Sequence, residues 1–308
     1  MRRFFIISAF IFAFTIFGED TGGDPGKFML LGQNARSIAR GQAMSASPTI
    51  EVFSYNPASL LGIKGYQGTA SYQFLALDRT IYSAVFGMNI RNDAAFALSW
   101  THGGVEMIGR NNDGEPTGDL RNGKDNIALA FSKKVYKGLS AGVSVRYFQE
   151  QLSEISSYTA GFDIGLAHHI RKYDLRLGLS VQNLHMVNSW DSSELYGEGY
   201  SVDEHFPVTL RLGSYWNLDF IPVNLAADAS FTQNRDPRLH FGASYDIIDN
   251  ISVHAGLDHE LPTGGLSINV PISEKLKLSA DYGLSAERWD LPMRHVFGIR
   301  VFYDKQVK

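Results

Sequence analysis

The chain has 308 residues, a formal net charge of −4 and no cysteine. The nearly balanced charge argues against nucleic acid as a partner, and the lack of cysteine excludes disulfides, thiolate catalysis and cysteine-ligated metals. The mean hydropathy of −0.12 argues against a bundle of membrane helices, because each spanning helix needs about 20 apolar residues.

The first 18 residues have the composition of a secretory signal peptide. A basic Met-Arg-Arg start precedes the apolar run Phe4–Phe17, and an acidic pair follows Gly18. This run is short for a membrane span and typical of an export signal. We predict cleavage near Gly18; the alternative is an N-terminal membrane anchor.

Residues 19–63 form the part of the exported chain that lacks a strand pattern. Within Gly32–Leu61, small apolar residues such as Ala35 and Ala39 recur at helical spacing. The motif Tyr55-Asn56-Pro57-Ala58 follows as a turn, because proline stops a helix and keeps the preceding residue extended. We predict a short helical plug that ends at this turn.

From residue 64 onward, apolar and polar residues alternate. In Leu139–Phe148 one set is apolar, and the other contains Ser140, Ser144 and Arg146. This period of two indicates strands with one apolar face, and most are long enough to cross a bilayer, which takes about 9–11 residues. The fourteen predicted strands are 65–77, 80–91, 93–103, 124–135, 138–150, 154–169, 173–186, 206–218, 222–233, 237–248, 250–260, 264–272, 275–286 and 293–303.

The connections between these strands differ in length in a regular way. The two long ones, Gly104–Gly123 and Val187–His205, are the third and the seventh, whereas even-numbered ones such as Asp249-Asn250 are tight. Bacterial outer-membrane barrels have an even number of strands, short periplasmic turns and longer outer loops. If both chain ends face the periplasm, the long connections face outward.

The polar faces carry charges of both signs at the strand centres. In a barrel these faces line the lumen, where neighbouring strands pair opposite charges. In the alternative fold, a secreted β-sandwich, they would face water. Aromatic residues near strand ends, such as Tyr66, Phe206 and Trp216, are typical of an interfacial girdle. The charged positions are Arg146, Asp163, Arg176, Arg211, Asp228, Arg238, Asp258, Lys277, Asp281 and Arg300.

The N-terminal stretch resembles that of the PorV/PorQ family, which is related to the FadL-type transporters of long-chain fatty acids and other hydrophobic compounds. Those families have a Gly-Ala-Arg-Ala-like helix and a Trp/Tyr-Asn-Pro-Ala-Gly-Leu turn. Here an acidic pair is replaced by Ser47–Glu51, and the turn has Ser59 in place of glycine. The matching segments are Asn34-Ala35-Arg36-Ser37, Ala39-Arg40-Gly41-Gln42-Ala43 and Tyr55-Asn56-Pro57-Ala58-Ser59-Leu60.

The resemblance implies an all-β fold, a transmembrane antiparallel barrel of about 14 strands with the helical plug in its lumen. It also implies one of two activities. FadL-type members pass a small hydrophobic ligand across the outer membrane, whereas PorV-type members serve the type IX secretion system and bind exported proteins. We assign residues 1–18 to the signal peptide, 19–63 to the plug and 64–308 to an integral outer-membrane barrel.

Candidate sites for chemistry are few. His168 and His169 are adjacent on a strand and point to opposite faces, so they do not share a metal. The loop Asn111–Glu115 lacks the ligand spacing of a calcium loop, and no G-x-S-x-G motif appears. His254 and Asp258 share a face, as many pairs in a polar lumen do. We expect no catalytic residue, no metal and no cofactor.

One apolar patch precedes the plug helix. Phe28, Met29, Leu30 and Leu31 could line a pocket for an acyl chain or pack the plug against the wall. We assign them as candidate ligand-binding residues and Tyr55-Asn56-Pro57-Ala58 as the plug turn. The expected partners are outer-membrane lipids, a hydrophobic small molecule or secreted cargo, and the barrel-assembly machinery, which would read the aromatic last strand.

Overall fold

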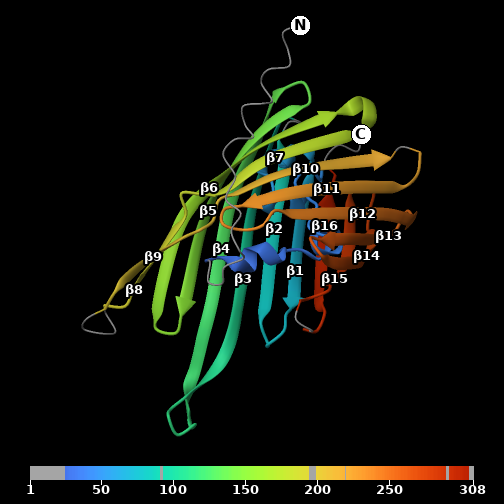
Figure 1. Cartoon of the computed structure of the whole chain (residues 1–308). Helices are drawn as coiled ribbons and strands as arrows, with labels where there is room; N and C mark the ends of the chain where they lie inside the picture. Colours follow the sequence, from blue (N-terminus) through green and yellow to red (C-terminus); the bar gives the residue numbers. More distant parts are fainter. Residues whose placement is uncertain (1–24, 91–92, 194–198, 219, 289–290, 305–308) are drawn as a thin grey trace.

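The strands of the protein close into an antiparallel barrel (Figure 1). The computed structural model describes residues 25–90, 93–193, 199–218, 220–288 and 291–304. Within them, each barrel strand pairs with its neighbours in the chain, and the first strand closes the barrel by pairing with the last, from Tyr66↔Tyr303 to Phe74↔His295. The prediction of a closed barrel of 14 strands is confirmed.

The strands fall into a barrel set and one separate hairpin. The hairpin consists of β8 (Val187–Asp191) and β9 (Ser201–His205). The barrel strands are β1 (Tyr66–Phe74), β2 (Thr80–Ile90), β3 (Ala94–Arg110), β4 (Pro116–Tyr136), β5 (Leu139–Leu152), β6 (Ile155–Ile170), β7 (Leu175–Leu184), β10 (Thr209–Leu218), β11 (Val223–Thr232), β12 (Arg238–Ile248), β13 (Ile251–Asp258), β14 (Leu261–Pro271), β15 (Leu276–Ser285) and β16 (Arg294–Tyr303).

Side chains alternate between the two faces of the wall as predicted. On β5, Ser144 and Arg146 are buried inside the barrel, whereas Val143 and Val145 are exposed on its outer face. The outer face is apolar on strand after strand, and the inner face carries serine, threonine and glutamine. The alternative of a secreted sandwich is wrong, because its polar faces would be exposed to water.

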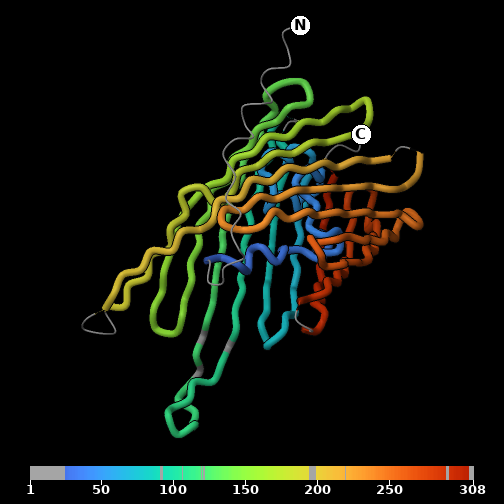
Figure 2. Tube along the Cα trace, in the orientation of Figure 1, coloured from blue at the N-terminus to red at the C-terminus, as the bar shows by residue number. Residues whose placement is uncertain are grey.

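The long connection Gly104–Gly123 is mostly strand. Pairing of β3 with β4 continues as far as Arg110↔Pro116, with a register shift after Gly109↔Gly118, and the two strands extend well beyond their neighbours (Figure 2). The prediction of a loop was wrong here because side chains on both faces are exposed beyond the barrel wall, so the alternation that signals a strand disappears. Backbone hydrogen bonds need no such alternation. Similarly, β8 and β9 occupy much of Val187–His205.

The N-terminal segment contains four short helical pieces that lie inside the barrel (Figure 1). The predicted helix is reduced to α1 (Ala35–Ala39), because Gly41 and Gln42 have positive φ angles of 59° and 61° that end it. The others are 3-10 helices, η1 (Lys27–Leu31), η2 (Ile50–Ser54) and η3 (Pro57–Gly62); a further one, η4 (Arg171–Tyr173), forms a turn between strands. None of the helices in the described ranges is long and apolar enough to cross a membrane.

Candidate functional site

The described part of the plug, residues 25–63, fills the lumen. Ile38, Met44 and Ile50 are fully buried although they belong to no strand. Inward-facing glycines of the wall allow the plug backbone to approach: a Cβ at Gly142 or Gly178 would lie 2.5 Å from plug backbone atoms. Wall and plug are therefore complementary in shape.

Opposite charges pair across neighbouring strands inside the barrel, as predicted. Arg146 Nε lies 2.6 Å from Asp163 Oδ2 on the next strand, and Arg300 Nε lies 2.7 Å from Asp281 Oδ2. In the low dielectric of a packed lumen, such pairs replace the water that isolated charges would need.

One of these pairs also holds the plug. Asp228 Oδ2 accepts hydrogen bonds from the backbone N–H groups of Met44 and Ser45, at 3.0 and 2.9 Å. Arg211 donates to the Gln42 carbonyl at 2.9 Å and lies 3.3 Å from Asp228 Oδ2. A wall ion pair thus binds the backbone that follows α1.

The plug contributes charges of its own. Glu51 on η2 is 1% exposed, and its Oε1 lies 3.6 Å from Arg300 Nε. Arg40 is buried with its guanidinium 5.3 Å from the ring centre of Tyr215. Burial, with a smaller effect from neighbouring Arg36, lowers the pKa of Arg40 to about 10, so it stays charged at neutral pH.

The motif Tyr55-Asn56-Pro57-Ala58 leads from η2 into η3, after which β1 begins. Asn56 is extended, with φ −158° and ψ 108°, and its Oδ1 accepts a hydrogen bond from Ala58 N at 3.0 Å. Its Nδ2 donates to the Leu166 carbonyl at 3.1 Å, which ties the turn to β6. The Ala58 carbonyl accepts from Ser132 and Ser140. Three strands, β4, β5 and β6, therefore hold this corner in place.

An apolar cluster lies on the side of the plug that faces the long connections. We call it the outer apolar cluster: Phe28, Met29, Phe148, Met186 and Phe206. The ring centres of Phe28 and Phe148 are 6.1 Å apart, and those of Phe148 and Phe206 are 5.1 Å apart at an interplanar angle of 77°. A cavity of about 50 Å³ lies beside it.

The four candidate ligand-binding residues are not equivalent. Phe28 and Met29 belong to the outer apolar cluster, and Met29 and Leu30 line the cavity. Leu30 is 36% exposed. Leu31 lies outside both groups, and its carbonyl accepts a hydrogen bond from Arg294.

Sequence reasoning missed the barrel residues that complete the cluster. Phe148 occupies an inward position of β5, where the pattern calls for a polar residue, and that exception was the available signal. Phe206 was assigned to an aromatic girdle but is buried inside the barrel. A residue next to a strand end has no neighbours on its own strand to indicate its face, so sequence alone did not place it.

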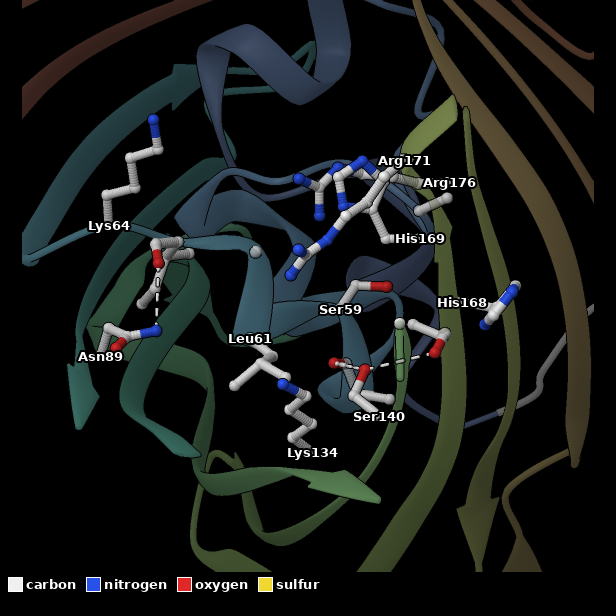
Figure 3. Close-up of a pocket in the computed structure, with 16 residues that line it drawn as sticks. Ser59, Leu61, Lys64, Asn89, Lys134, Ser140, His168, His169, Arg171 and Arg176 are labelled. Atoms are coloured by element: carbon white, nitrogen blue, oxygen red, sulfur yellow. Dashed lines mark hydrogen bonds between the residues drawn. The ribbon is translucent and has the colours of Figure 1, made fainter. Parts of the chain in front are cut away.

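A larger cavity of about 240 Å³ lies at the opposite end, where the short turns are (Figure 3). The plug forms its floor through η3 and Ala46. The ends of β2, β4, β5, β6 and β7 form its walls. His169 lies on the cavity side, whereas the ring of His168 points away from it (Figure 3), as expected for adjacent residues of a strand.

The histidines of the lumen have polar partners. His254 lies 2.8 Å from the hydroxyls of both Ser244 and Ser267, and His240 Nδ1 lies 2.9 Å from Asp258 Oδ1. Within the described ranges, no group of three or more His, Cys, Asp or Glu residues is arranged to hold a metal ion.

Comparison with solved structures identifies proteins of the same fold. A FadL homologue of Pseudomonas aeruginosa matches with a TM-score of 0.62 and 13% identity, over 88% of this chain and 98% of that one. The P. putida toluene transporter TodX matches with a TM-score of 0.57 and 14% identity, over 88% and 97%. At such identities the similarity shows a FadL-like fold. No family model and no curated protein matches the sequence.

Proposed function

We propose that the protein is an integral outer-membrane barrel that binds a small hydrophobic molecule at the outer apolar cluster and passes it inward beside the plug. The observation that carries the proposal is the cluster itself. Its five apolar side chains stand together at the loop-side end of the lumen beside a cavity, whereas other inward apolar wall residues, such as Val85 and Val296, pack against the plug. Aromatic and methionine side chains at the edge of a cavity offer an apolar solute a favourable site.

The outer face of the wall supports the membrane location. Large apolar side chains such as Phe86, Leu98 and Leu129 are exposed on it. A continuous apolar face on a closed barrel matches lipid, and the short turns at one end would face the periplasm. In this proposal residues 1–18 are the export signal, residues 19–63 the plug and residues 64–308 the barrel, which the barrel-assembly machinery inserts among outer-membrane lipids.

Binding requires η1 to move. The 50 Å³ cavity holds little more than a water or two, since a water takes up about 30 Å³. None of the residues of η1 is buried, and the piece is tied to the plug through the Leu30 carbonyl, which accepts from Gln42 Nε2 at 3.1 Å. A ligand displaces Phe28 and Met29 from Phe148 and Phe206 and takes their place. The toluene transporter among the similar folds supports a ligand of this class.

The test is native mass spectrometry of the protein extracted gently from its own outer membrane, with toluene as the added probe. We expect a bound small apolar molecule in the parent protein. The substitution Phe148→Asp places a charge among Phe28 and Phe206 and should weaken binding by about tenfold to a hundredfold, because the apolar contact of one buried side chain contributes about 1.5–3 kcal/mol.

The matched control is Ile108→Asp. Ile108 is 60% exposed on the part of β3 that extends beyond the barrel, so it adds the same charge far from the cluster. Equal binding of toluene by the parent protein and by Phe148→Asp would contradict the proposal. An exported protein that co-purifies in place of a small molecule would favour a secretion role.

A further inference from the structure

The cavity at the turn end differs from the rest of the lumen in its charge. Its lining includes the cationic residues Lys64, Lys134, Arg171 and Arg176, and no aspartate or glutamate. Elsewhere in the lumen, wall arginines such as Arg146, Arg211 and Arg300 are matched by carboxylates on the next strand. Here the cations come from four separate places: the chain before β1, the end of β4, η4 and the start of β7. We call this cavity the basic pocket.

Within the described part of the chain, none of these four cations forms an ion pair. The carboxylate that acts most on Arg176 is Asp174. Both of its oxygens are already bonded, Oδ1 to His169 Nε2 at 2.8 Å and Oδ2 to Asn217 Nδ2 at 2.9 Å. Four cations that line one cavity, with no carboxylate among the lining residues, favour an anion in that cavity.

The plug fixes the pocket from below. Ser140 Oγ donates to the carbonyl of Ala58 at 3.0 Å, and Asn89 donates to the carbonyl of Ile63 at 3.3 Å, so η3 is held to both walls. Figure 3 shows Arg171 and Arg176 on one side and Lys134 on another, with Lys64 farther out. The cations therefore line a cavity whose floor is hydrogen-bonded to the wall.

We propose that the basic pocket is a binding site for a phosphate-type oxyanion. The size fits a compact group, since about 240 Å³ equals the liquid volume of about eight waters. Two guanidinium groups can each form paired hydrogen bonds to phosphate oxygens, and two ammonium groups add point charges. The phosphate can be free in the periplasm or belong to the head group of a phospholipid. This site is independent of the hydrophobic cargo proposed above.

The test is titration calorimetry of the folded protein in a non-ionic detergent at fixed ionic strength. Inorganic phosphate is the first probe and dihexanoyl phosphatidylglycerol the second. We expect saturable binding of at least one probe. The double substitution Lys134→Gln and Arg171→Gln should weaken it by about tenfold or more, which corresponds to about 1.4 kcal/mol.

The matched control is the double substitution Lys137→Gln and Lys172→Gln. It removes two positive charges from the same two turns, but neither residue lines the pocket. We expect this control to bind within about twofold of the parent, because neither ammonium group lines the pocket and salt screens charges that lie at a distance. The heat-dependent shift in gel mobility checks that each variant is folded, and Lys64→Gln alone replaces the first pair if that pair fails to fold.

The outcomes separate the sources of the phosphate. Binding of inorganic phosphate supports a free anion as the ligand, and binding of the lipid alone supports a head group. Absence of saturable binding of both probes overturns the proposal, as does an equal loss in the pocket pair and the control pair, which would mean general surface attraction. Toluene binding at the outer apolar cluster should be unchanged in the pocket pair, so failure of the two proposals can be told apart.

Discussion

At the scale of single residues, the plug is held by wall side chains that bind its backbone. Asp228 and Arg211 are the strongest example. They pair with each other and also form hydrogen bonds to the plug backbone between Gln42 and Ser45. Ser180 acts in the same way on the Tyr55 carbonyl, at 2.7 Å. These hydrogen bonds to the plug backbone do not depend on the identity of the plug side chains, as long as the backbone follows the same path.

The substitution Asp228→Asn should therefore loosen the plug. It leaves the buried Arg211 without its counter-ion, and breaking a buried pair in this way costs about 3–5 kcal/mol. We expect limited proteolysis to cut within residues 25–63 much faster than in the parent protein. Asp113→Asn, in an exposed hairpin tip, is the control; equal cleavage rates in the two variants would contradict the assignment.

The pH dependence of plug binding follows from the buried groups of the plug. Burial lowers the pKa of Arg40 to about 10 and raises that of Tyr55 to about 12. A buried cation whose pKa is lowered in the folded state reduces the free energy of unfolding at pH values below that pKa. A buried phenol whose pKa is raised reduces the free energy of unfolding at pH values above its ordinary pKa of about 10. Neither group titrates between pH 7 and pH 9, a window that also lies above the ordinary histidine pKa of about 6.5, so we expect the proteolysis rate of the plug to be constant there. A change of more than about threefold would contradict this.

At the scale of elements, η3 connects the plug to the barrel. Asn56 caps it through Ala58 N, Pro57 takes the first helical position, and the same asparagine binds the Leu166 carbonyl of β6. Proline suits that position because it has no N–H to leave unpaired. The corner therefore combines a helix start, a strand contact and the floor of the basic pocket.

The substitution Asn56→Ala should destabilise the protein by about 1–2 kcal/mol, because both the cap and a buried carbonyl lose their partner. Urea unfolding of the protein in detergent measures the change. Asn111→Ala provides the comparison. Asn111 Oδ1 accepts from the N–H groups of Asp113 and Glu115 in the exposed β3–β4 tip. Loss of that cap should leave global unfolding unchanged, and an equal effect of both substitutions would be inconsistent with a structural role for η3.

At the scale of the whole molecule, the plug is needed to fill the barrel. A barrel of about 8 strands is just filled by its own inward side chains, so one of fourteen has space to spare. Here that space is occupied by α1, η2 and η3 with their buried apolar residues. Polar wall residues such as Gln73 and Thr101 are buried beneath them.

Deletion of residues 25–63 should convert the protein into an open polar pore. The inward serine, threonine and glutamine side chains would then be hydrated, and ions would pass. Conductance in planar bilayers measures this, with the intact protein as the closed control. A deletion variant that shows the heat-dependent gel shift of a folded barrel but no added conductance would refute the idea that the plug closes the lumen.

The sequence by itself determined the barrel. A period of two reports the two faces of each strand directly, because one face is apolar and the other is mostly polar. The strand number and the pairing of charges such as Arg146 with Asp163 followed from it. The proline turn at Asn56-Pro57 was also predictable, since it depends on local backbone restrictions.

Only the tertiary structure decided the two sites. The outer apolar cluster joins the plug, β5, the segment after β7 and the segment before β10, and the basic pocket joins four separate segments around η3. Neither site produces a periodic pattern in the sequence, because each chain segment that lines it supplies few side chains. Barrel closure and plug insertion bring them together, and proximity between residues far apart in the chain depends on the complete register of the wall.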